Sequence, residues 1–422
     1  MDLLQPVRGT ADLLPEDKAR HNHVASVALD VASRSGFQDM ATPVFEFTQV
    51  FSRPLGASSD VVAKETYSFE DRGGTGLTLR PEGTASAIRA VISNGLTQSL
   101  PLRWFYAGPM FRYERPQKGR MRQFHQFGCE LIGPTSPLAD AEIISLGAAI
   151  LSELKVLPHT KLHLNSLGDQ ESRLAYRQAL IDYLTRYRSS LSEDSQRRLD
   201  SNPLRILDSK SETDQEILTE APCLPSYLSN EAKTHFDQVS ACLNQAAIEF
   251  VVDPLLVRGL DYYSHTAFEF ITNALGSQGT VLGGGRYDGL SETLGGPPLP
   301  AVGFAAGIER LALLADDHAA AVPDIGLIAA DTDAEAEAFG LAVSLREAGL
   351  SCVMLINGNM GKKMKAANRL GCVSVVIAGS DELSRRAVSV RSMTNGEQFE
   401  VEISELTSWL SGRLSKSAQE GD

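Results

Sequence analysis

The sequence has few cysteines and no long uninterrupted apolar segment. Its 422 residues include 5 cysteines, which lie far apart without a CxxC pair, so neither a zinc site nor a disulfide framework is indicated. The best apolar stretch, 301–315, is interrupted by Glu309 and Arg310 before it reaches the ~18 residues that a membrane-spanning helix needs. Residues 1–15 lack the pattern of a secretory signal. We therefore expect a cytoplasmic protein in a reducing compartment, without a membrane partner.

Positive charge and phosphate-binding loops are also scarce. The formal net charge of -14 argues against general nucleic-acid binding, which needs clustered Lys and Arg, so any RNA contact must be local. Neither GxxxxGK[ST] nor GxGxxG occurs, and GGGRYDG at 283–289 has the wrong spacing. A nucleotide must therefore be bound by another device. No cluster of His, Cys or Asp has metal-ligand spacing, so we expect no metal held by the protein itself.

The composition that remains is typical of a soluble globular protein with at least two domains. The chain is 43% hydrophobic and 22% charged, and its length exceeds one ordinary core. Apolar spacing predicts a helix over 15–35, and Gly and Pro turns divide 77–132 into strands around a short helix at 84–92. This pattern is typical of an antiparallel sheet. Residues 170–250 are rich in Arg, Glu, Gln and Ser and poor in Gly, which predicts a helical insertion before β character returns at Leu255.

A linker at 316–324 predicts a boundary, with a first domain of residues 1–322 and a second of residues 323–422. Beyond the linker, strand-like and helical segments alternate, which predicts a small parallel α/β unit. The expected strands are 325–330, 352–356 and 374–378, and the expected helices are 333–348 and 361–370. Asn395 and Gly396 then predict a hairpin turn before a terminal helix.

The most informative segment is FRYERPQKGRMRQFHQFGCELIG at 111–133, which indicates a strand, a basic loop and a second strand. Period-two alternation places several polar side chains on one face of these strands: Arg112 and Glu114 on the first, and Phe124, Gln126, Gly128 and Glu130 on the second. The loop adds the cations Arg115, Lys118, Arg120 and Arg122. Guanidinium groups bind phosphate oxygens and an aromatic face stacks on a base, so a polyphosphate nucleotide suits this surface. A solvated hairpin with a charged edge explains the residues equally well.

The segment 111–126 resembles the second signature motif of class II aminoacyl-tRNA synthetases in its histidine-specific form. Four further segments are similar, in order, to motifs of the histidyl-tRNA synthetase family: RGTADLLP at 8–15, TLRPEGT at 78–84, LVRGLDYY at 256–263 and AVGFAAGIERL at 301–311. The resemblance implies an α+β catalytic domain on an antiparallel sheet with a helical insertion, followed by an α/β anticodon-binding domain. It implies ATP-dependent ligation of L-histidine to tRNA(His) through a histidyl-adenylate, by a homodimer with the segment around Pro43 near its interface.

The resemblance also assigns residues to ATP, which Mg²⁺ would accompany. Arg112 would bind the α-phosphate, Glu114 the adenine amino edge and Phe124 the adenine face. Arg120 and Arg310 would bind the terminal phosphates. Arg310 lies in the first turn of a predicted helix, whose amides favour anions. By spacing alone, an ordinary ion pair of Arg310 with Glu309 is the better interpretation.

Histidine recognition needs partners for the imidazole nitrogens, the ammonium and the carboxylate. The resemblance implies that Glu82 and Thr84 hold the ammonium, that Glu130 and Tyr263 take the ring nitrogens, and that Tyr262 lines the pocket. Adjacent tyrosines more often belong to a core or an interface. A carboxylate such as Glu130, in contrast, is seldom buried without a partner. A site of this kind rejects analogues that lack the matching polar groups.

The catalytic group implied by the resemblance consists of Arg258, Arg112 and Gln126. Arg258 would stabilise charge on the α-phosphate while the histidine carboxylate attacks, and Gln126 would contact the carboxylate side. An arginine at a strand edge is the ordinary alternative for Arg258. His125 lies opposite Gln126 in the alternation, which favours a structural role over that of a general base.

Contacts with tRNA are implied for Gln117 and for four cations of the second domain, Lys362, Lys363, Lys365 and Arg369. A charge run of this kind is more often only a solvated face. Two residues depart from the family pattern: Met121 stands where Tyr is common, and Tyr113 where His is frequent.

Two other functions compete with that of a ligase. A synthetase-like, histidine-sensing regulatory subunit of ATP phosphoribosyltransferase typically loses motif residues and the anticodon domain, whereas this chain retains Arg112, Glu114, Arg258 and Arg310 and an α/β tail. A pure RNA-binding module leaves the paired arginines and carboxylates unexplained.

Overall fold

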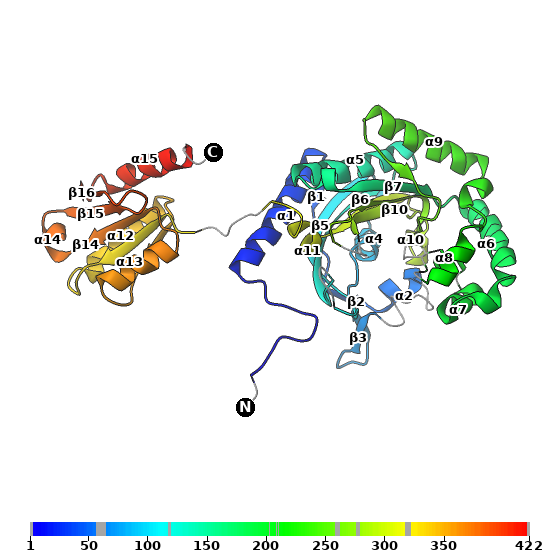
Figure 1. Ribbon diagram of the computed structural model, residues 1–422, viewed down its shortest axis with the longest axis horizontal. Coiled ribbons are helices and arrows are strands. Elements are labelled where there is room, and N and C mark those ends of the chain that lie inside the picture. The colour runs from blue at the N-terminus through cyan, green and yellow to red at the C-terminus, as the bar shows by residue number, and fades with distance from the viewer. Residues whose placement is uncertain are drawn as a thin grey trace. The chain divides into compact units, whose positions relative to one another are not determined.

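The computed structural model describes residues 3–55, 65–116, 120–201, 203–207, 209, 211–257, 262–275, 279–316 and 322–419. The chain forms two compact units, residues 1–319 and residues 320–422, each with its own core (Figure 1). Among the described residues, no helix is long and apolar enough to cross a membrane.

The first unit is built on an eight-stranded sheet with the order β1-β5-β6-β11-β10-β9-β7-β8. Its strands are β1 (Gln38–Asp39), β5 (Leu102–Phe111), β6 (Gln123–Ile132), β7 (Lys161–Ser166), β8 (Val251–Val252), β9 (Ser264–Ile271), β10 (Thr280–Arg286) and β11 (Ala301–Gly307). All interior pairs are antiparallel, and the two edge pairs, β1 with β5 and β7 with β8, are parallel. The expected antiparallel sheet is therefore confirmed, with parallel strands added at its edges.

Helices cover both faces of this sheet (Figure 1). The main core packs the sheet against α1 (Pro15–Arg34), α5 (Pro137–Glu153), α9 (Asn230–Gln245) and α11 (Ile308–Ala312). The opposite face is covered by α2 (Gln49–Leu55), α4 (Thr84–Ser93) and α10 (Leu290–Thr293), and short 3₁₀ turns occur at η1 (Leu96–Gln98) and η2 (Leu157–His159). The helix expected from Pro15 ends one residue earlier than predicted, and Pro15 occupies its first turn, where a missing N–H is harmless.

A smaller antiparallel sheet has the order β2-β4-β3. Its strands are β2 (Phe45–Phe47), β4 (Gly76–Leu79) and β3 (Tyr67–Glu70). Large apolar side chains on its outer strands remain exposed in the single chain: Phe45 by 53%, Phe47 by 62% and Phe69 by 47%.

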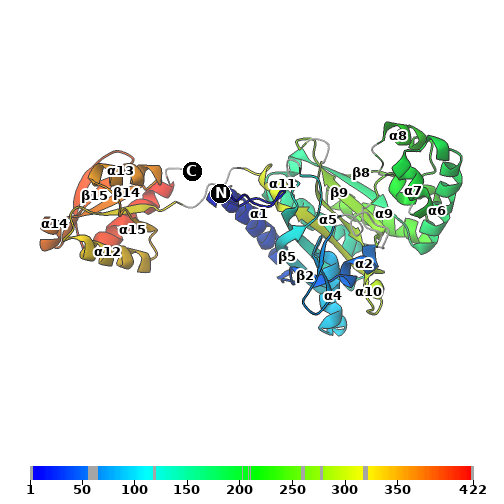
Figure 2. The same ribbon diagram turned by 90° about the horizontal axis from the view of Figure 1, so that it is seen from below.

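The expected helical insertion contains α6 (Gln170–Thr185), α7 (Glu193–Ser201), α8 (Glu212–Leu218), η3 (Arg188–Ser190), η4 (Pro203–Ile206) and η5 (Leu224–Tyr227). These elements share a core of their own that includes Tyr176 and Leu180, and they gather at one end of the first unit (Figure 2). Helix α9 follows them in sequence but packs on α5, with Val239 and Leu243 in the main core. Asp169 connects the starts of α6 and α9. Its carboxylate accepts a 2.8 Å hydrogen bond from the amide of Ser172 in α6 and another from the hydroxyl of Ser229, which precedes α9.

The second unit has a five-stranded sheet with the order β13-β12-β14-β15-β16. Its elements are β12 (Ile325–Ala329), α12 (Glu335–Glu347), β13 (Cys352–Met354), α13 (Met360–Arg369), β14 (Ser374–Ala378), α14 (Ser380–Ser384), β15 (Ala387–Ser392), β16 (Gln398–Glu402) and α15 (Leu406–Gln419). Strands β13, β12 and β14 are parallel, and β15 and β16 continue the sheet in antiparallel order. Gly396 adopts φ 76° in the turn between β15 and β16, where the hairpin was expected.

Candidate active site

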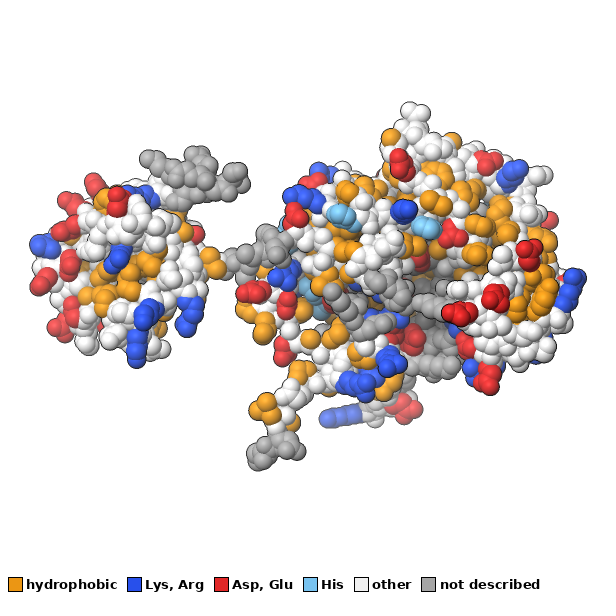
Figure 3. Space-filling model, in the orientation of Figure 1, with side chains coloured by type: hydrophobic (Ala, Val, Ile, Leu, Met, Phe, Trp, Pro, Cys, Tyr) orange, Lys and Arg blue, Asp and Glu red, His pale blue; other side chains and the backbone are white. Residues whose placement is uncertain are grey.

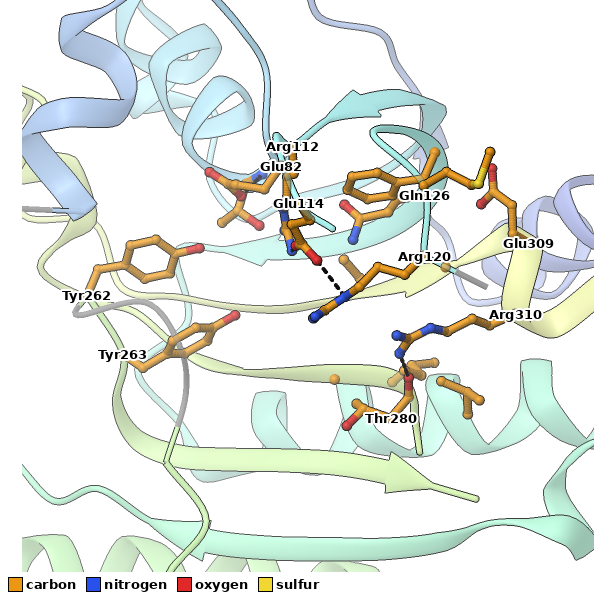
Figure 4. Close-up of a pocket in the computed structure, with 18 residues that line it drawn as sticks. Glu82, Arg112, Glu114, Arg120, Gln126, Tyr262, Tyr263, Thr280, Glu309 and Arg310 are labelled. Atoms are coloured by element: carbon orange, nitrogen blue, oxygen red, sulfur yellow. Dashed lines mark hydrogen bonds and ion pairs between the residues drawn. The ribbon is translucent and has the colours of Figure 1, made fainter. Parts of the chain in front are cut away.

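A hollow of ≈ 190 Å³ lies over the middle of the large sheet in the first unit (Figure 4). It is lined by residues from β6, β10, β11, α4 and α11 and from the segments before α4, after β5 and before β9. The lining residues are Glu82, Thr84, Arg112, Glu114, Arg120, Met121, Phe124, Gln126, Tyr262, Tyr263, Thr280, Val281, Leu282, Gly283, Ala305, Gly307, Glu309 and Arg310. Ten residues singled out in the sequence thus meet around one space: Glu82, Thr84, Arg112, Glu114, Arg120, Phe124, Gln126, Tyr262, Tyr263 and Arg310.

Other sequence-predicted residues lie elsewhere. Glu130 is fully buried next to Thr84 and does not line the hollow. Arg258 and Gln117 fall outside the described residues. The four cations of the second domain lie in the second unit.

One part of the hollow is dominated by guanidinium groups and one carboxylate. Nε of Arg120 lies 2.5 Å from Oε2 of Glu114, and a terminal nitrogen of Arg112 lies 3.9 Å from Oε1 of the same side chain. The Arg112 guanidinium is also held by a 2.9 Å hydrogen bond to the Pro81 carbonyl and lies 5.2 Å from the centre of the Phe124 ring. These contacts fix the cation and the aromatic face beside each other.

Arg310 completes this cationic part of the hollow from α11 and donates a hydrogen bond to the Thr280 carbonyl. Burial lowers the pKa of Arg310, and the positive charges of Arg120 and Arg112 lower it further, while Glu114 raises it. Three guanidinium groups therefore share one part of the hollow, where Glu114 pairs with Arg120 and lies near Arg112. A polyanion placed among them would relieve their mutual repulsion.

Buried polar atoms without partners mark the other part. Among the described residues, Oε1 of Gln126 and the hydroxyl of Tyr262 are buried and have no hydrogen-bond partner. Figure 4 shows the Tyr262 and Tyr263 side chains entering from the side opposite Arg120 and Arg310. Because buried polar groups in folded proteins are nearly always paired, these two atoms indicate where a polar ligand binds.

Glu82 lies at the start of α4. One carboxylate oxygen accepts a hydrogen bond from the Thr84 amide, 2.7 Å, and the other from the Ala85 amide, 2.9 Å. Burial raises the pKa of Glu82, while these amides and the nearby Arg112 lower it in part. The side chain thus satisfies the free amides of the helix end and also faces the hollow.

Sequence reasoning missed two tyrosines that hold Glu130 in place. Tyr106 donates to Oε1 of Glu130 over 3.0 Å, Thr84 donates to the same oxygen over 2.7 Å, and Tyr287 donates to Oε2. Burial raises the pKa of Glu130 to about 7, although the three hydroxyl donors oppose that shift. A carboxylic acid with a pKa near 7 exchanges a proton readily at neutral pH.

Glycines make room for this arrangement, and once the strand pairing is known they mark it in the sequence. A Cβ at Gly303, opposite Glu130 on β11, would lie 1.8 Å from Oε2 of Glu130. A Cβ at Gly128 would lie 2.4 Å from the Tyr106 hydroxyl. Tyr106 pairs directly with Gly128 across β5 and β6, so period-two alternation puts it on the same face as Glu130.

His125 faces away from Gln126, as alternation predicts. Its Nδ1 lies 2.9 Å from Oε1 of Glu309, and its ring meets the His21 ring edge-on, with centroids 5.5 Å apart. Two residues depart from the family pattern. Met121 lines the hollow. Tyr113 is 52% exposed, and Cζ of Arg122 lies over its ring, 3.8 Å from the ring centre.

A second hollow, of ≈ 580 Å³, lies in the second unit between β13 and α13. Lys362, Lys363, Lys365 and Arg369 line it together with Ile356, which is 73% exposed. The Lys363 ammonium donates to the Ala329 carbonyl over 2.9 Å. Figure 3 shows cations over α13, while acidic side chains gather around α14.

Comparison with known proteins gives these sites a context. The profile of the histidyl-tRNA synthetase family matches residues 9–311, and that of the anticodon binding domain matches residues 324–413. Histidine--tRNA ligase of Rhodospirillum rubrum is 53% identical over 97% of this chain and 99% of its own length, and that of Gluconacetobacter diazotrophicus is 51% identical over 98% and 99%. The crystal structure of apo S. aureus histidyl-tRNA synthetase superimposes with a TM-score of 0.81 at 34% identity, over 96% of this chain and 99% of that one. The chain belongs to the histidyl-tRNA synthetase family.

Proposed function

We propose that the hollow on the large sheet is where this enzyme activates L-histidine with ATP before transfer to tRNA(His). The chain is a class II histidine--tRNA ligase, as its full-length relatives indicate. The regulatory alternative is not favoured, because those relatives share about half of all residues over nearly the whole chain and are named as ligases.

The cationic part of the hollow suits the nucleotide. Arg112 is assigned to the α-phosphate, Arg120 and Arg310 to the terminal phosphates, Phe124 to the adenine face and Glu114 to its amino edge. In the free enzyme Glu114 neutralises Arg120, so a bound triphosphate takes over as partner of this guanidinium. Mg²⁺ arrives as part of the nucleotide substrate, with phosphate oxygens among its ligands.

The part with unpartnered atoms suits histidine. The free Oε1 of Gln126 and hydroxyl of Tyr262 provide hydrogen-bonding groups for a polar amino acid, and Glu82 provides a carboxylate for its ammonium. Tyr263 and Glu130 are assigned to the two imidazole nitrogens, with Thr84 between Glu82 and Glu130. Because Glu130 is buried behind Thr84, its contact with the ring requires Thr84 to yield when histidine binds.

The reaction takes two steps. A carboxylate oxygen of histidine attacks the α-phosphorus of ATP, the bond to the bridging oxygen breaks, and pyrophosphate leaves. The 3′-hydroxyl of the terminal adenosine of tRNA then attacks the carbonyl carbon, the hydroxyl proton is released, and AMP leaves. Arg112 and Arg258 act in the first step, because negative charge on the α-phosphate oxygens is largest in its transition state.

The observation that carries this assignment is the meeting of three arginines with the unpartnered atoms of Gln126 and Tyr262 in one hollow. The test is histidine-dependent exchange of labelled pyrophosphate into ATP, measured for the wild-type protein and for Arg258→Ala. The control is Arg188→Ala, because Arg188 lies in the insertion and its side chain is half exposed. We expect exchange by the wild type and the control, and a loss of at least a hundredfold for Arg258→Ala. Equal rates would remove Arg258 from the mechanism, and no exchange by the wild type would contradict the ligase.

A homodimer is proposed from the small sheet. Phe45, Phe47 and Phe69 expose about half of their surface or more. Phe45 and Phe47 come shortly after Pro43, and the resemblance places the segment around Pro43 near an interface. Three aromatic side chains on one small sheet exceed the scattered apolar residues normal for a monomer surface. In sedimentation experiments the wild type should be a dimer, and Phe47→Ser should shift the equilibrium towards the monomer. A monomeric wild type would refute the proposal.

We assign the second unit to tRNA recognition in the cytoplasm. Its hollow combines the cations Lys362, Lys365 and Arg369 with the exposed Ile356, so it offers partners for phosphates beside an apolar surface for bases. Gln117 is assigned to the acceptor end of the tRNA.

A further inference from the structure

Three side chains with metal-binding atoms meet beside the nucleotide part of the hollow. His21 lies on α1, His125 on β6 and Glu309 at the start of α11. One ligand atom from each residue lies within 4.8 Å of the ligand atoms of the other two. The sequence does not reveal this cluster, because its members come from distant elements that only the packing of α1 and α11 on β6 brings together.

The carboxylate of the cluster is held in a fixed orientation. Its two oxygens accept hydrogen bonds from the His125 amide over 2.8 and 2.9 Å, and Oε1 also lies 2.9 Å from Nδ1 of the same residue. Glu309 is thus positioned by the backbone of β6. Binding of a metal ion between this imidazole nitrogen and this carboxylate oxygen releases the proton that they share, because both ligand atoms must be unprotonated.

The second histidine is buried with a free polar atom. His21 is 8% exposed, and its Nδ1 is buried without a hydrogen-bond partner among the described residues. Its ring meets that of His125 edge-on, with centroids 5.5 Å apart. Packing alone accounts for the contact between the rings but leaves the buried nitrogen unsatisfied, which is uncommon for a buried polar atom.

We propose that His21, His125 and Glu309 form a binding site for Zn²⁺ or a related transition-metal ion. Two imidazoles and one carboxylate are a ligand set that zinc uses, with water in the fourth position. Bonds of the usual zinc length place tetrahedral ligand atoms about 3.3 Å apart. Nδ1 of His125 and Oε1 of Glu309, 2.9 Å apart, come close to this spacing, and a ligand atom of His21 lies no more than 4.8 Å from those of the other two residues.

The ligand set also separates this ion from the Mg²⁺ that accompanies ATP. Mg²⁺ takes oxygen ligands and retains several waters, so two imidazoles disfavour it. Glu309 also lines the hollow, but the test of the metal site does not depend on the roles proposed for the other lining residues, because binding of an ion is measured without any substrate.

The test uses the full-length chain without an affinity tag, freed of metal by a chelator. Zn²⁺ affinity is measured by competition with a chromophoric chelator, and Co²⁺ is added separately to record the visible absorption of a tetrahedral complex. The variants are His21→Gln and His125→Asn, and the control is His23→Gln, which removes a histidine of α1 outside the cluster. Circular dichroism checks that each variant is folded.

We expect the wild type and His23→Gln to bind one equivalent of Zn²⁺, to give the tetrahedral Co²⁺ spectrum, and to retain Zn²⁺ in millimolar Mg²⁺. Each cluster variant should bind at least tenfold more weakly. Equal affinity in all four proteins would assign the zinc to other histidines and overturn the site. The absence of binding by the wild type would reduce the cluster to a hydrogen-bonded pair packed against His21.

Discussion

The Tyr106 hydroxyl donates a 3.0 Å hydrogen bond to a Glu130 carboxylate that no solvent reaches. With Thr84 and Tyr287, it provides three hydroxyl donors to two carboxylate oxygens. Glu130 is thereby fixed behind the histidine part of the hollow by residues from β5, α4 and the end of β10. The specificity proposed for this site therefore depends in part on Tyr106 and Tyr287, which do not line the hollow themselves.

Substituting Tyr106→Phe should weaken histidine binding. The change removes one donor to Glu130 and leaves the ring in place beside Gly83 and Gly128. A hydrogen bond to a charged or ionisable group contributes about 1.5 kcal/mol, which corresponds to a roughly tenfold higher KM for histidine. Pyrophosphate exchange at varied histidine and varied ATP measures both constants, and the KM for ATP should change far less.

The control for this prediction is Tyr176→Phe. Tyr176 is fully buried in the core of the insertion, and its hydroxyl has no partner among the described residues. Its removal should leave both KM values unchanged. If Tyr106→Phe raises the KM for ATP as much as that for histidine, Tyr106 shapes the whole hollow and does not position Glu130 specifically.

Glu130 should make stability depend on pH. Burial raises the pKa of Glu130 from 4.5 to about 7 in the folded protein. Between these values the folded state keeps the proton and the unfolded state loses it, so the free energy of unfolding falls as pH rises from about 4.5 to about 7. The difference in pKa corresponds to roughly 3 kcal/mol.

Denaturant unfolding of wild type and Glu130→Gln at pH 5 and pH 8 measures this effect. The amide does not titrate, so the variant should gain stability relative to the wild type on going from pH 5 to pH 8, by roughly 3 kcal/mol. An unchanged difference between the two proteins at both pH values would mean that Glu130 is ionised throughout, stabilised by its three hydroxyl donors.

The buried ion pair of Arg286 and Asp140 should be essential for the fold of the first unit. Arg286 is 1% exposed and Asp140 0%, and Nε of the arginine lies 3.1 Å from Oδ2 of the carboxylate. Arg286→Met leaves a buried carboxylate without its main partner, which typically costs about 3–5 kcal/mol. Calorimetry should show a lower unfolding temperature for this unit.

The matched control is Arg188→Met, in a pair with Asp200 whose side chains are 50% and 63% exposed. An exposed pair contributes about 0–1 kcal/mol, so the unfolding temperature should barely change. Similar effects of the two substitutions would contradict the importance assigned to burial.

Much of the fold could be predicted from local patterns, because regular periodicity and turn residues act over short distances. Residues 15–35 and 84–92 differ from α1 and α4 by one residue at one end. The hairpin and the alternation along β6 also followed from the sequence. The prediction that Arg112 and Glu114 share a strand face was wrong, because β5 ends at Phe111 and both residues lie after the strand. The strand order did not, since the parallel partners β1 and β8 are only two residues long and are defined by tertiary contacts.

The residues of the site also fall into those that the sequence predicted and those that it did not. The residues of the signature motifs were predicted through the resemblance to the family, and ten of them meet around the hollow. The sequence did not predict roles for three other residues, because each acts through a partner on a distant element: Tyr106, Tyr287 and His21. The glycines opposite Glu130 and Tyr106 become informative only when the pairing of β5, β6 and β11 is known.

The double substitution Lys365→Ala with Arg369→Ala should weaken tRNA binding without affecting histidine activation. Both side chains are exposed and line the hollow of the second unit, whereas the neighbouring Lys363 ammonium is bonded to the Ala329 carbonyl. Loss of two phosphate contacts should raise the KM for tRNA about tenfold and reduce the slope of log KM against log salt concentration by about 2. Aminoacylation measures both quantities, and pyrophosphate exchange without tRNA should remain at the wild-type rate. Arg385→Ala removes an exposed cation near Glu400, away from this hollow, and should leave the salt dependence unchanged; an equal effect of this control would show that only the overall charge of the unit matters.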